Sequence, residues 1–431
     1  MPKRKALYYI AFMLLLTALL MVVSNNVRIL ASFRFLWAPG FLLFTFIFYR
    51  KVFTAKNVIA ALVYGILYVA ILQYTLWNYA NDWYKRMIFE DFYAMIVFVL
   101  LFAVFHYNRY WEIWSKLAKF SILFMVITGV MTIVATEINP LVVRGSYSSG
   151  YLEIDNYDFL HRLGFGSYGY MTAIVALFPI LIYFLKQQNK VWLSKKILIL
   201  FILFLYYILF KAQIFANILV ASGVLAFSFM GARRLSKSIG YIIVVAIALS
   251  LVPTSFYANN FRNIGNNFES SPLLHSKFND MAEYIENPVL DEDETSTGSG
   301  SRASRYPALL KTFLAAPLLG DASYNSPYLD ELSTGGHLYW MSRLALWGIF
   351  GFVGYLFMLR QVFKPVLRIF DSEFRFYYYL SLGSTIALGL LKNIAGREPY
   401  IMLLIIIPGL YFIKEQFYSR QNSKISKTKV L

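Results

Sequence analysis

The sequence predicts an all-α polytopic membrane protein with about 12 transmembrane helices and one large outer loop. Of its 431 residues, 59% are hydrophobic and 15% are charged, whereas soluble domains carry about 25% charged residues. Apolar runs long enough to cross a bilayer recur along most of the chain, and they are continuous rather than alternating. Only a helix or a closed barrel satisfies the backbone in lipid, so continuous runs indicate helices. These observations exclude a soluble globular enzyme.

The first expected span is residues 6–23, which follow Lys3, Arg4 and Lys5. Its 18 uncharged residues exceed the apolar core of about 7 to 15 residues in a cleavable signal sequence, so we expect a retained helix. The later runs come near the ~20 residues that a bilayer requires. In order, the further expected spans are residues 29–48, 58–77, 89–105, 120–136, 168–185, 197–210, 214–230, 239–257, 338–359, 376–394 and 400–413.

The positions of the basic residues predict that both termini face the cytoplasm. With the N-terminus inside, the inner connections and the C-terminal tail hold 25 of the 40 Lys and Arg residues, whereas the outer segments hold 13. Only 4 of the 23 acidic residues are inner, which gives net charges of +21 inside and −6 outside. This asymmetry follows the positive-inside rule. The overall charge of +17 therefore reflects orientation, and no nucleic acid partner is expected.

Two outer loops interrupt the pattern of short connections and divide the chain into three parts. Residues 1–257 hold nine expected spans and a shorter outer loop at about 137–166, residues 258–337 form a large outer loop, and residues 338–431 hold three spans and a basic cytoplasmic tail. Loops this long are usually functional or disordered. The acidic, Gly/Ser-rich residues 291–301 cannot bury a core, so we expect the chemistry in the rest of the large loop.

Residues 301–320 predict a short helix at the outer membrane surface. Ser304 is a suitable N-cap, and Pro307 is tolerated in the first turn. An apolar stripe follows at Leu309, Leu310, Phe313 and Leu314. Arg302 and Arg305 lie at the N-terminal mouth of this helix, where backbone N–H groups favour anions. Two guanidinium groups there suit a diphosphate, and the alternative on spacing alone is a pair of solvated or headgroup-binding arginines.

His337 stands where the large loop meets the next span, after two glycines and before several aromatic residues. A histidine that titrates near neutral pH at a boundary between water and lipid suits general-base catalysis. Histidine in the aromatic belt of a membrane interface is also common. His337 is therefore a candidate catalytic base with a structural alternative.

The shorter outer loop combines Arg144, His161 and Arg162 with several tyrosines. Aromatic faces beside hydroxyl and carboxylate groups suit sugars, whose C–H faces are apolar and whose edges need hydrogen bonds. Tyrosine at the interface is also expected in any membrane protein. We interpret this loop as a candidate glycan-binding surface, with interface anchoring as the alternative.

Charged residues within or beside the expected spans are further candidates, because intramembrane charge is costly and often functional. Arg34 and Arg343 lie inside expected spans, and Lys211, Lys392 and Arg397 lie at outer ends. Snorkelling to lipid headgroups is the alternative for the last three. The chain has no cysteine and no HExxH or Walker pattern, so we expect neither a metal site nor another cofactor.

Residues 300–354 carry a signature of ordered motifs. It consists of an arginine, an aromatic residue, a Pro-x-x-Gly turn, a histidine at the start of a helix and two glycines, here Arg302, Tyr306, Pro317, Gly320, His337, Gly348 and Gly351. This order resembles the O-antigen polymerase and O-antigen ligase superfamily of bacterial surface-polysaccharide enzymes. The chain departs from that family at Leu338, where asparagine is usual, and at Lys211, which stands in place of a Ser-Arg pair.

The resemblance implies a membrane glycosyltransferase of GT-C-like fold in the bacterial inner membrane. It implies inverting, metal-independent transfer of a glycan from a polyprenyl diphosphate carrier to a sugar hydroxyl on the outer face. In this interpretation Arg302, supported by Arg305, stabilises the leaving diphosphate, and His337 accepts the proton of the acceptor hydroxyl. The residues expected to bind substrate are Arg144, His161, Arg162, Lys211, Tyr306, Arg343 and Arg397.

Three functions remain open at this level. We favour a polymerase of lipid-linked repeat units that makes O-antigen or capsular-type polysaccharide, with a chain-length regulator as a candidate protein partner. The first alternative is an O-antigen ligase that transfers glycan to the lipid A core, but the outer loops lack the dense basic patch expected for that phosphorylated acceptor. The second is a flippase or transporter of lipid-linked sugars, a class that places its sites near the bilayer midplane and often contains repeats.

Overall fold

The structure is a computed structural model that describes residues 2–27, 36–76, 82–140, 142–145, 156–187, 193–231, 253–269, 272–286, 305–320, 338–394 and 396–414. Every regular element in these segments is a helix, which confirms the all-α class. The first half contributes α1 (Pro2–Leu19), α2 (Met21–Asn26), α3 (Ala38–Phe48), a 3-10 turn η2 (Arg50–Thr54), α4 (Lys56–Leu76), α5 (Asp82–Tyr107), α6 (Trp111–Ile138), α7 (Val142–Gly145), α8 (Tyr157–Leu163), α9 (Tyr168–Lys186) and α10 (Lys195–Lys211).

The second half begins with a helix at Phe215–Gly231, followed by α12 (Thr254–Asn266), α13 (Pro272–Glu286), α15 (Arg305–Ala315), α16 (Tyr339–Leu367) and α17 (Ser372–Leu391). The last helix starts as α18 (Arg397–Ile401), passes through a π-helical turn η4 (Met402–Ile406) and ends at Lys414.

Within the described segments, three helical stretches are long and apolar enough to cross a membrane, namely Trp111–Ile138, Tyr157–Lys186, which includes both α8 and α9, and Tyr339–Leu367. Shorter apolar helices are Ala38–Phe48, Lys56–Leu67, Phe92–Tyr107 and Phe215–Gly231. These helices agree with a membrane protein, while the set of twelve spans stays a prediction. The ninth expected span, residues 239–257, lies outside the described residues up to residue 252, and its last residues belong to α12.

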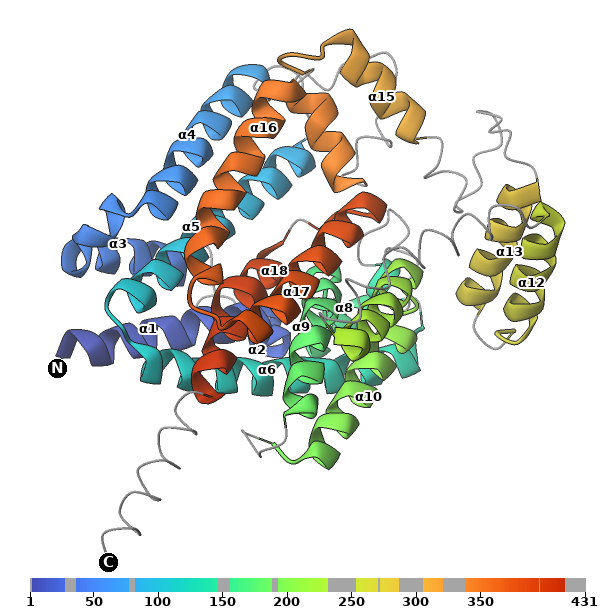
Figure 1. The fold of residues 1–431 in the computed structure, drawn as a ribbon, viewed down its shortest axis with the longest axis horizontal. Coiled ribbons are helices and arrows are strands. Elements are labelled where there is room, and N and C mark those ends of the chain that lie inside the picture. The colour runs from blue at the N-terminus through green and yellow to red at the C-terminus, as the bar shows by residue number, and fades with distance from the viewer. Residues whose placement is uncertain are drawn as a thin grey trace, which may run out of the picture.

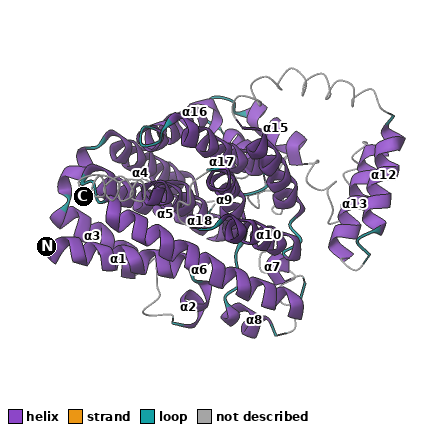
Figure 2. Ribbon diagram, turned by 60° about the horizontal axis from the view of Figure 1, so that its bottom comes forward, coloured by secondary structure: helices purple, strands orange, loops and turns teal. Residues whose placement is uncertain are grey.

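The two ends of the helical bundle differ. The N-terminus lies at one end, and α12, α13 and α15 lie toward the opposite side (Figure 1). We call the first the terminal end and the second the loop end. α12 and α13 pack against each other and stand beside the bundle in both views (Figure 2). The ring centroids of Phe210 and Phe268 lie 5.9 Å apart, and those of Phe215 and Phe278 5.3 Å apart, so aromatic contacts attach this hairpin to the bundle.

α9 is the central helix, and its side chains from Gly169 to Phe184 are buried. It packs against α10, α17 and α18. Tertiary hydrogen bonds hold the last helix beside it: Trp114 Nε1 donates to the carbonyl oxygen of Ile405 at 2.7 Å, and the Tyr378 hydroxyl donates to that of Leu403 at 2.9 Å. Both carbonyl groups belong to the π-turn η4, where the ordinary helical pairing is altered. The two side chains therefore satisfy buried backbone groups of an irregular turn.

α16 is bent. Gly348 has a φ of 61° and a ψ of −173°, so the helix divides into residues 339–347 and 349–367. Figure 1 shows the two halves meeting at a sharp bend near the end of α15. The sequence predicts a single span over residues 338–359; the observed helix is longer at its C-terminal side and is interrupted, because a conformation of this kind is open to glycine and strained for other residues.

Candidate functional site

The predicted surface helix of the large loop is present as α15. Leu309 is 2% exposed and packs in a small apolar cluster with Leu338 and Ala345 near the start of α16. Leu314 is 64% exposed. The apolar stripe predicted for this helix therefore divides into a side that packs on α16 and an open side of the kind that lies against lipid.

The two residues expected to carry the chemistry, Arg302 and His337, lie outside the described residues, as do Ser304 and the side chain of Arg305. Their neighbours are described. Arg305 is the first residue of α15, and Leu338, which follows His337, is only 1% exposed. The structure therefore shows where Arg305 and Leu338, the residues that follow the two undescribed segments, join the bundle.

The predicted Pro-x-x-Gly turn at residues 317–320 packs into the bend of α16. An ideal Cβ on Gly320 would lie 2.3 Å from the backbone nitrogen of Gly348, which leaves no room for a side chain. The N–H of Ile349 donates to the carbonyl oxygen of Pro317 at 2.9 Å. Because the bend frees backbone donors at the start of the second half of α16, the turn supplies their acceptors. The glycine at 348 thus allows the two backbones to approach closely.

α15 and α16 both attach to the last turn of α17. The hydroxyl of Tyr306, one of the predicted substrate-binding residues, donates to the carbonyl oxygen of Leu390. The backbone N–H of Tyr339 donates to the carbonyl oxygen of Lys392 at 3.4 Å. Tyr306 remains 37% exposed. Residues 390–392 are therefore the place where the start of α15 meets the start of α16.

Lys392 is a buried cation at this place, with 5% of its surface exposed. Its Nζ donates to Oδ1 of Asn217, and the ring centroid of Tyr168 lies 5.2 Å from it. An amide oxygen and an aromatic face can both hold an ammonium group in a fixed position. Snorkelling to headgroups, the alternative for this lysine, does not describe a side chain that is buried.

A buried carboxylate stands at the start of the last helix. Glu398 is 5% exposed, and its Oε1 accepts a 3.1 Å hydrogen bond from the Ser167 hydroxyl. Arg397, a predicted substrate-binding residue, has its Nε 3.9 Å from the same oxygen. An ideal Cβ on Gly169 would lie 2.4 Å from the other carboxylate oxygen, so glycine makes room for Glu398.

Consecutive residues of α9 and its N-cap link the buried cation to the buried carboxylate. Tyr168 faces Lys392, and Ser167 binds Glu398 while accepting a hydrogen bond from the N–H of Tyr170. Lys392 is one of the charged candidates that the sequence places at an outer span end, whereas Glu398 was not expected at the site. The available signal was the presence of charged residues at the outer ends of two apolar runs.

Arg343, another predicted substrate-binding residue, lies inside the bend of α16 and is 5% exposed. Its guanidinium carbon is 3.2 Å from the ring centroid of Tyr339, 5.1 Å from that of Trp347 and 5.6 Å from that of Tyr355. The hydroxyl groups of Tyr339 and Tyr355 are 2.7 Å apart. Cation–π contacts and this hydrogen bond join the two halves of α16. The structure thus gives Arg343 a role in holding the bend, and its substrate-binding role stays a prediction.

Lys211 lies at the end of α10, where its Nζ is 2.5 Å from Oε1 of Glu137. The ring centroid of Tyr207 is 5.7 Å from the same nitrogen. A carboxylate partner neutralises most of the attraction that a lysine offers to phosphate. Lys392, by contrast, is buried and donates to an amide oxygen, that of Asn217.

The shorter outer loop is described in part. Residues 146–155 and the side chain of Arg144 lie outside the described residues. His161 and Arg162 are exposed on α8, and their backbone carbonyl oxygens accept hydrogen bonds from Asn25 at 2.7 Å and Asn26 at 2.6 Å. These hydrogen bonds therefore attach α8 to α2, and both predicted glycan-binding side chains are exposed on the surface of the protein.

The predicted site residues fall into separate groups. Tyr306, Arg343 and Arg397 belong to the helices that converge at the loop end, whereas Lys211, His161 and Arg162 belong to α10 and α8. Within the described ranges, no group of three or more His, Cys, Asp and Glu side chains has an arrangement that suits a metal ion. The converging helices supply buried charge and an attachment point for both signature segments. No protein-family model matches this chain, and no curated protein matches it.

Proposed function

We propose that the protein is a polymerase of polyprenyl-diphosphate-linked oligosaccharide repeat units, which makes O-antigen or capsular-type surface polysaccharide. The proposal places the loop end on the outer face of a bacterial inner membrane and both termini in the cytoplasm. It takes the chain as an inverting glycosyltransferase of twelve spans and GT-C-like fold. Its support comes from the signature in residues 300–354 and from the chemistry at the loop end.

The observation that carries the proposal is the convergence of two signature segments on the end of α17. Tyr306, which follows Arg305, and Tyr339, which comes two residues after His337, both bind backbone carbonyl groups within residues 390–392. Two residues of extended chain reach about 7 Å at most. In the sequence, His337 stands two residues before Tyr339 and Arg305 stands next to Tyr306, so the proposed base and an arginine of the signature adjoin the residues that bind this stretch of α17, although more than 30 positions separate them.

Lys392 supplies a fixed positive charge at that stretch. The leaving group of the reaction is a lipid diphosphate, on which negative charge develops as the sugar departs. Cations that are already positioned in a site of low dielectric stabilise such charge more strongly than cations in water. Lys392 is buried and held by Asn217, which agrees with a positioned cation. Arg302 and Arg305 would add guanidinium groups, whose planar forks match phosphate oxygens.

The proposed step joins two lipid-linked glycans. A hydroxyl oxygen of the acceptor sugar attacks the anomeric carbon of the donor, and the bond from that carbon to the diphosphate oxygen breaks. His337 accepts the proton of the attacking hydroxyl. The electron pair of the broken bond stays on the polyprenyl diphosphate, near Arg302 and Lys392. Attack from the side opposite the leaving group inverts the anomeric centre and lengthens the glycan.

Reconstitution tests this function directly. The full-length protein is placed in liposomes with a single lipid-linked repeat unit, and the products are separated by length and weighed by mass spectrometry. We expect a ladder of longer glycans on the carrier and an equal amount of released polyprenyl diphosphate for each bond formed. A requirement for lipid A core would identify a ligase instead. Transfer of intact units across the bilayer without extension would identify a transporter.

A further inference from the structure

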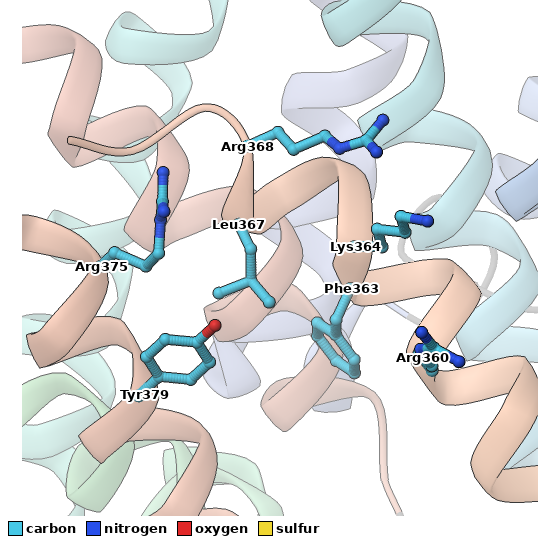
Figure 3. A pocket seen from close by; sticks show the side chains of 7 residues that line it. All are labelled: Arg360, Phe363, Lys364, Leu367, Arg368, Arg375 and Tyr379. Carbon is cyan, nitrogen blue, oxygen red and sulfur yellow. The ribbon is translucent and has the colours of Figure 1, made fainter. Parts of the chain in front are cut away.

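The last turns of α16 and the first turns of α17 line an open hollow of about 340 Å³ at the terminal end of the bundle. Its lining residues are Arg360, Phe363, Lys364, Leu367, Arg368, Arg375 and Tyr379. Figure 3 shows the rings of Phe363 and Tyr379 on either side of Leu367, with the basic side chains around them. The hollow therefore has an apolar floor and a basic rim.

The positive charge of the rim has no carboxylate partner among the lining residues. Asp371, in the loop between the two helices, is already engaged: it accepts a hydrogen bond from the N–H of Phe374 at 2.7 Å, and Lys414 Nζ lies 2.7 Å from its other oxygen. Arg375 Nη2 donates to the carbonyl oxygen of Phe370 at 2.8 Å, while its buried Nε has no hydrogen-bond partner within the described part of the chain. Four cations around an apolar floor favour an anionic ligand.

Both helices also carry exposed apolar side chains farther along from the hollow. Phe357 stands one turn before Arg360 on α16 and is 56% exposed, and Ile386 stands two turns after Tyr379 on α17 and is 51% exposed. On α17, Gly383 stands between Tyr379 and Ile386, and an ideal Cβ on it would have nothing within 4 Å. A basic pocket beside an open apolar surface matches a molecule that has both a phosphate group and a long alkyl chain.

We propose that this hollow binds the phosphate headgroup of an anionic phospholipid from the leaflet at the terminal end of the bundle. The guanidinium groups of Arg360 and Arg368 offer paired donors to phosphate oxygens, and Lys364 adds a point charge between them. The acyl chain lies along the exposed apolar side chains. The lipid therefore bridges α16 and α17 at the end of the bundle opposite the α15 contact.

Native mass spectrometry of the full-length protein in a neutral detergent tests this proposal. The probes are phosphatidylglycerol, phosphatidylcholine and inorganic pyrophosphate. We expect phosphatidylglycerol to bind more tightly than the other two. The variant R360Q/K364Q/R368Q should weaken phosphatidylglycerol binding about 100-fold, which corresponds to about 1 kcal/mol for each cation. The control K51Q/K195Q/K196Q, which removes three exposed charges elsewhere, should keep the affinity of the unmodified protein.

Three outcomes would overturn the proposal. The first is equal affinity for phosphatidylglycerol in R360Q/K364Q/R368Q and the unmodified protein. The second is an equal loss of affinity in the control variant, which would reveal attraction to net charge rather than to a site. The third is pyrophosphate binding as tight as lipid binding and lost in the same variant, which would identify a soluble phosphate as the ligand. If the triple variant does not fold, K364E serves in its place, with an expected loss of about tenfold.

Discussion

Gly320 and Gly348 meet backbone to backbone at the bend of α16. An ideal Cβ on Gly348 would lie 2.5 Å from the nitrogen of Gly320, and both residues have a positive φ, 61° at Gly348 and 76° at Gly320. The N–H of Phe350 donates to the carbonyl oxygen of Leu318 at 3.2 Å beside this contact. The contact joins the end of α15 to the middle of α16, so it fixes the position of the helix that follows the signature arginine.

Gly348→Ala should destabilise the protein and impair glycan extension. The conformation at Gly348 is one that only glycine adopts readily, which costs about 1 to 3 kcal/mol for another residue before any steric clash is counted. Thermal unfolding in detergent measures the effect. Gly223→Ala is the matched control, because an ideal Cβ on Gly223 has nothing within 4 Å. Equal unfolding temperatures for the two variants would show that the bend does not depend on glycine.

The sequence was sufficient for those features that depend on local pattern. Continuous apolar runs predicted the helical class, and the cap, the early proline and the apolar stripe predicted α15. The Pro-x-x-Gly pattern predicted the turn at residues 317–320. Each of these features is determined by residues that are close together in the sequence, so the local sequence is enough to predict it.

The surroundings of the buried charged residues Lys392 and Glu398 could not be predicted, because they consist of contacts between segments far apart in the sequence. Glu398 and its partner Ser167 are 231 residues apart, and Lys392 and Asn217 are 175 residues apart. Sequence position marked Arg343 and Lys392 alike as charged candidates in or beside a span, with snorkelling as the alternative for Lys392. Only the packing of helices separates them, because it surrounds Arg343 with aromatic rings and gives Lys392 an amide partner.

Lys392→Met should lower the rate of glycan extension about tenfold or more, since a fixed cation beside a leaving diphosphate contributes electrostatic stabilisation of the transition state. Methionine keeps the apolar length of the side chain, and the loss of folding stability should include the cost of leaving Asn217 without its donor, about 1 to 3 kcal/mol. Steady-state assays with the lipid-linked donor measure the rate. Lys195→Met removes an exposed cation at the start of α10 and should leave the rate unchanged. An unaffected rate in Lys392→Met would assign Lys392 a purely structural role.

The α12–α13 hairpin should loosen at acidic pH. Hydrogen bonds from the Arg262 guanidinium hold the pKa of the Glu286 carboxyl below its ordinary value of 4.5. Because the folded-state pKa is the lower one, the ion pair stabilises the hairpin above pH 4.5, and this contribution is lost as the pH falls through the folded-state pKa.

Hydrogen–deuterium exchange of α12 and α13, corrected for the intrinsic pH dependence of exchange, measures this loosening. Glu286→Gln should show fast exchange at every pH, because the charged acceptor is absent. Glu283→Gln, on the same helix, should keep the pH dependence of the unmodified protein. A flat exchange profile in the unmodified protein would contradict the prediction.

His337→Ala should abolish glycan extension while the protein still inserts into the membrane and unfolds at its usual temperature. The acceptor hydroxyl then lacks a base, and general-base catalysis typically contributes about 100- to 10,000-fold. His275→Ala is the control, because His275 lies in the hairpin with its Nδ1 3.0 Å from the carbonyl oxygen of Gly265. Long polymers made by His337→Ala would remove this histidine from the mechanism.

Arg302→Lys should lower turnover although it keeps the positive charge. A guanidinium presents two parallel N–H groups to a pair of phosphate oxygens, whereas an ammonium offers a point charge on a flexible stem. The defect should appear in the rate of extension, since the diphosphate gains charge as the bond to the sugar breaks. Arg50→Lys, an exposed position in η2, controls for the general effect of the exchange. Full activity in Arg302→Lys together with no activity in Arg302→Ala would mean that position 302 acts through its charge alone, and paired hydrogen bonding would then have to come from Arg305.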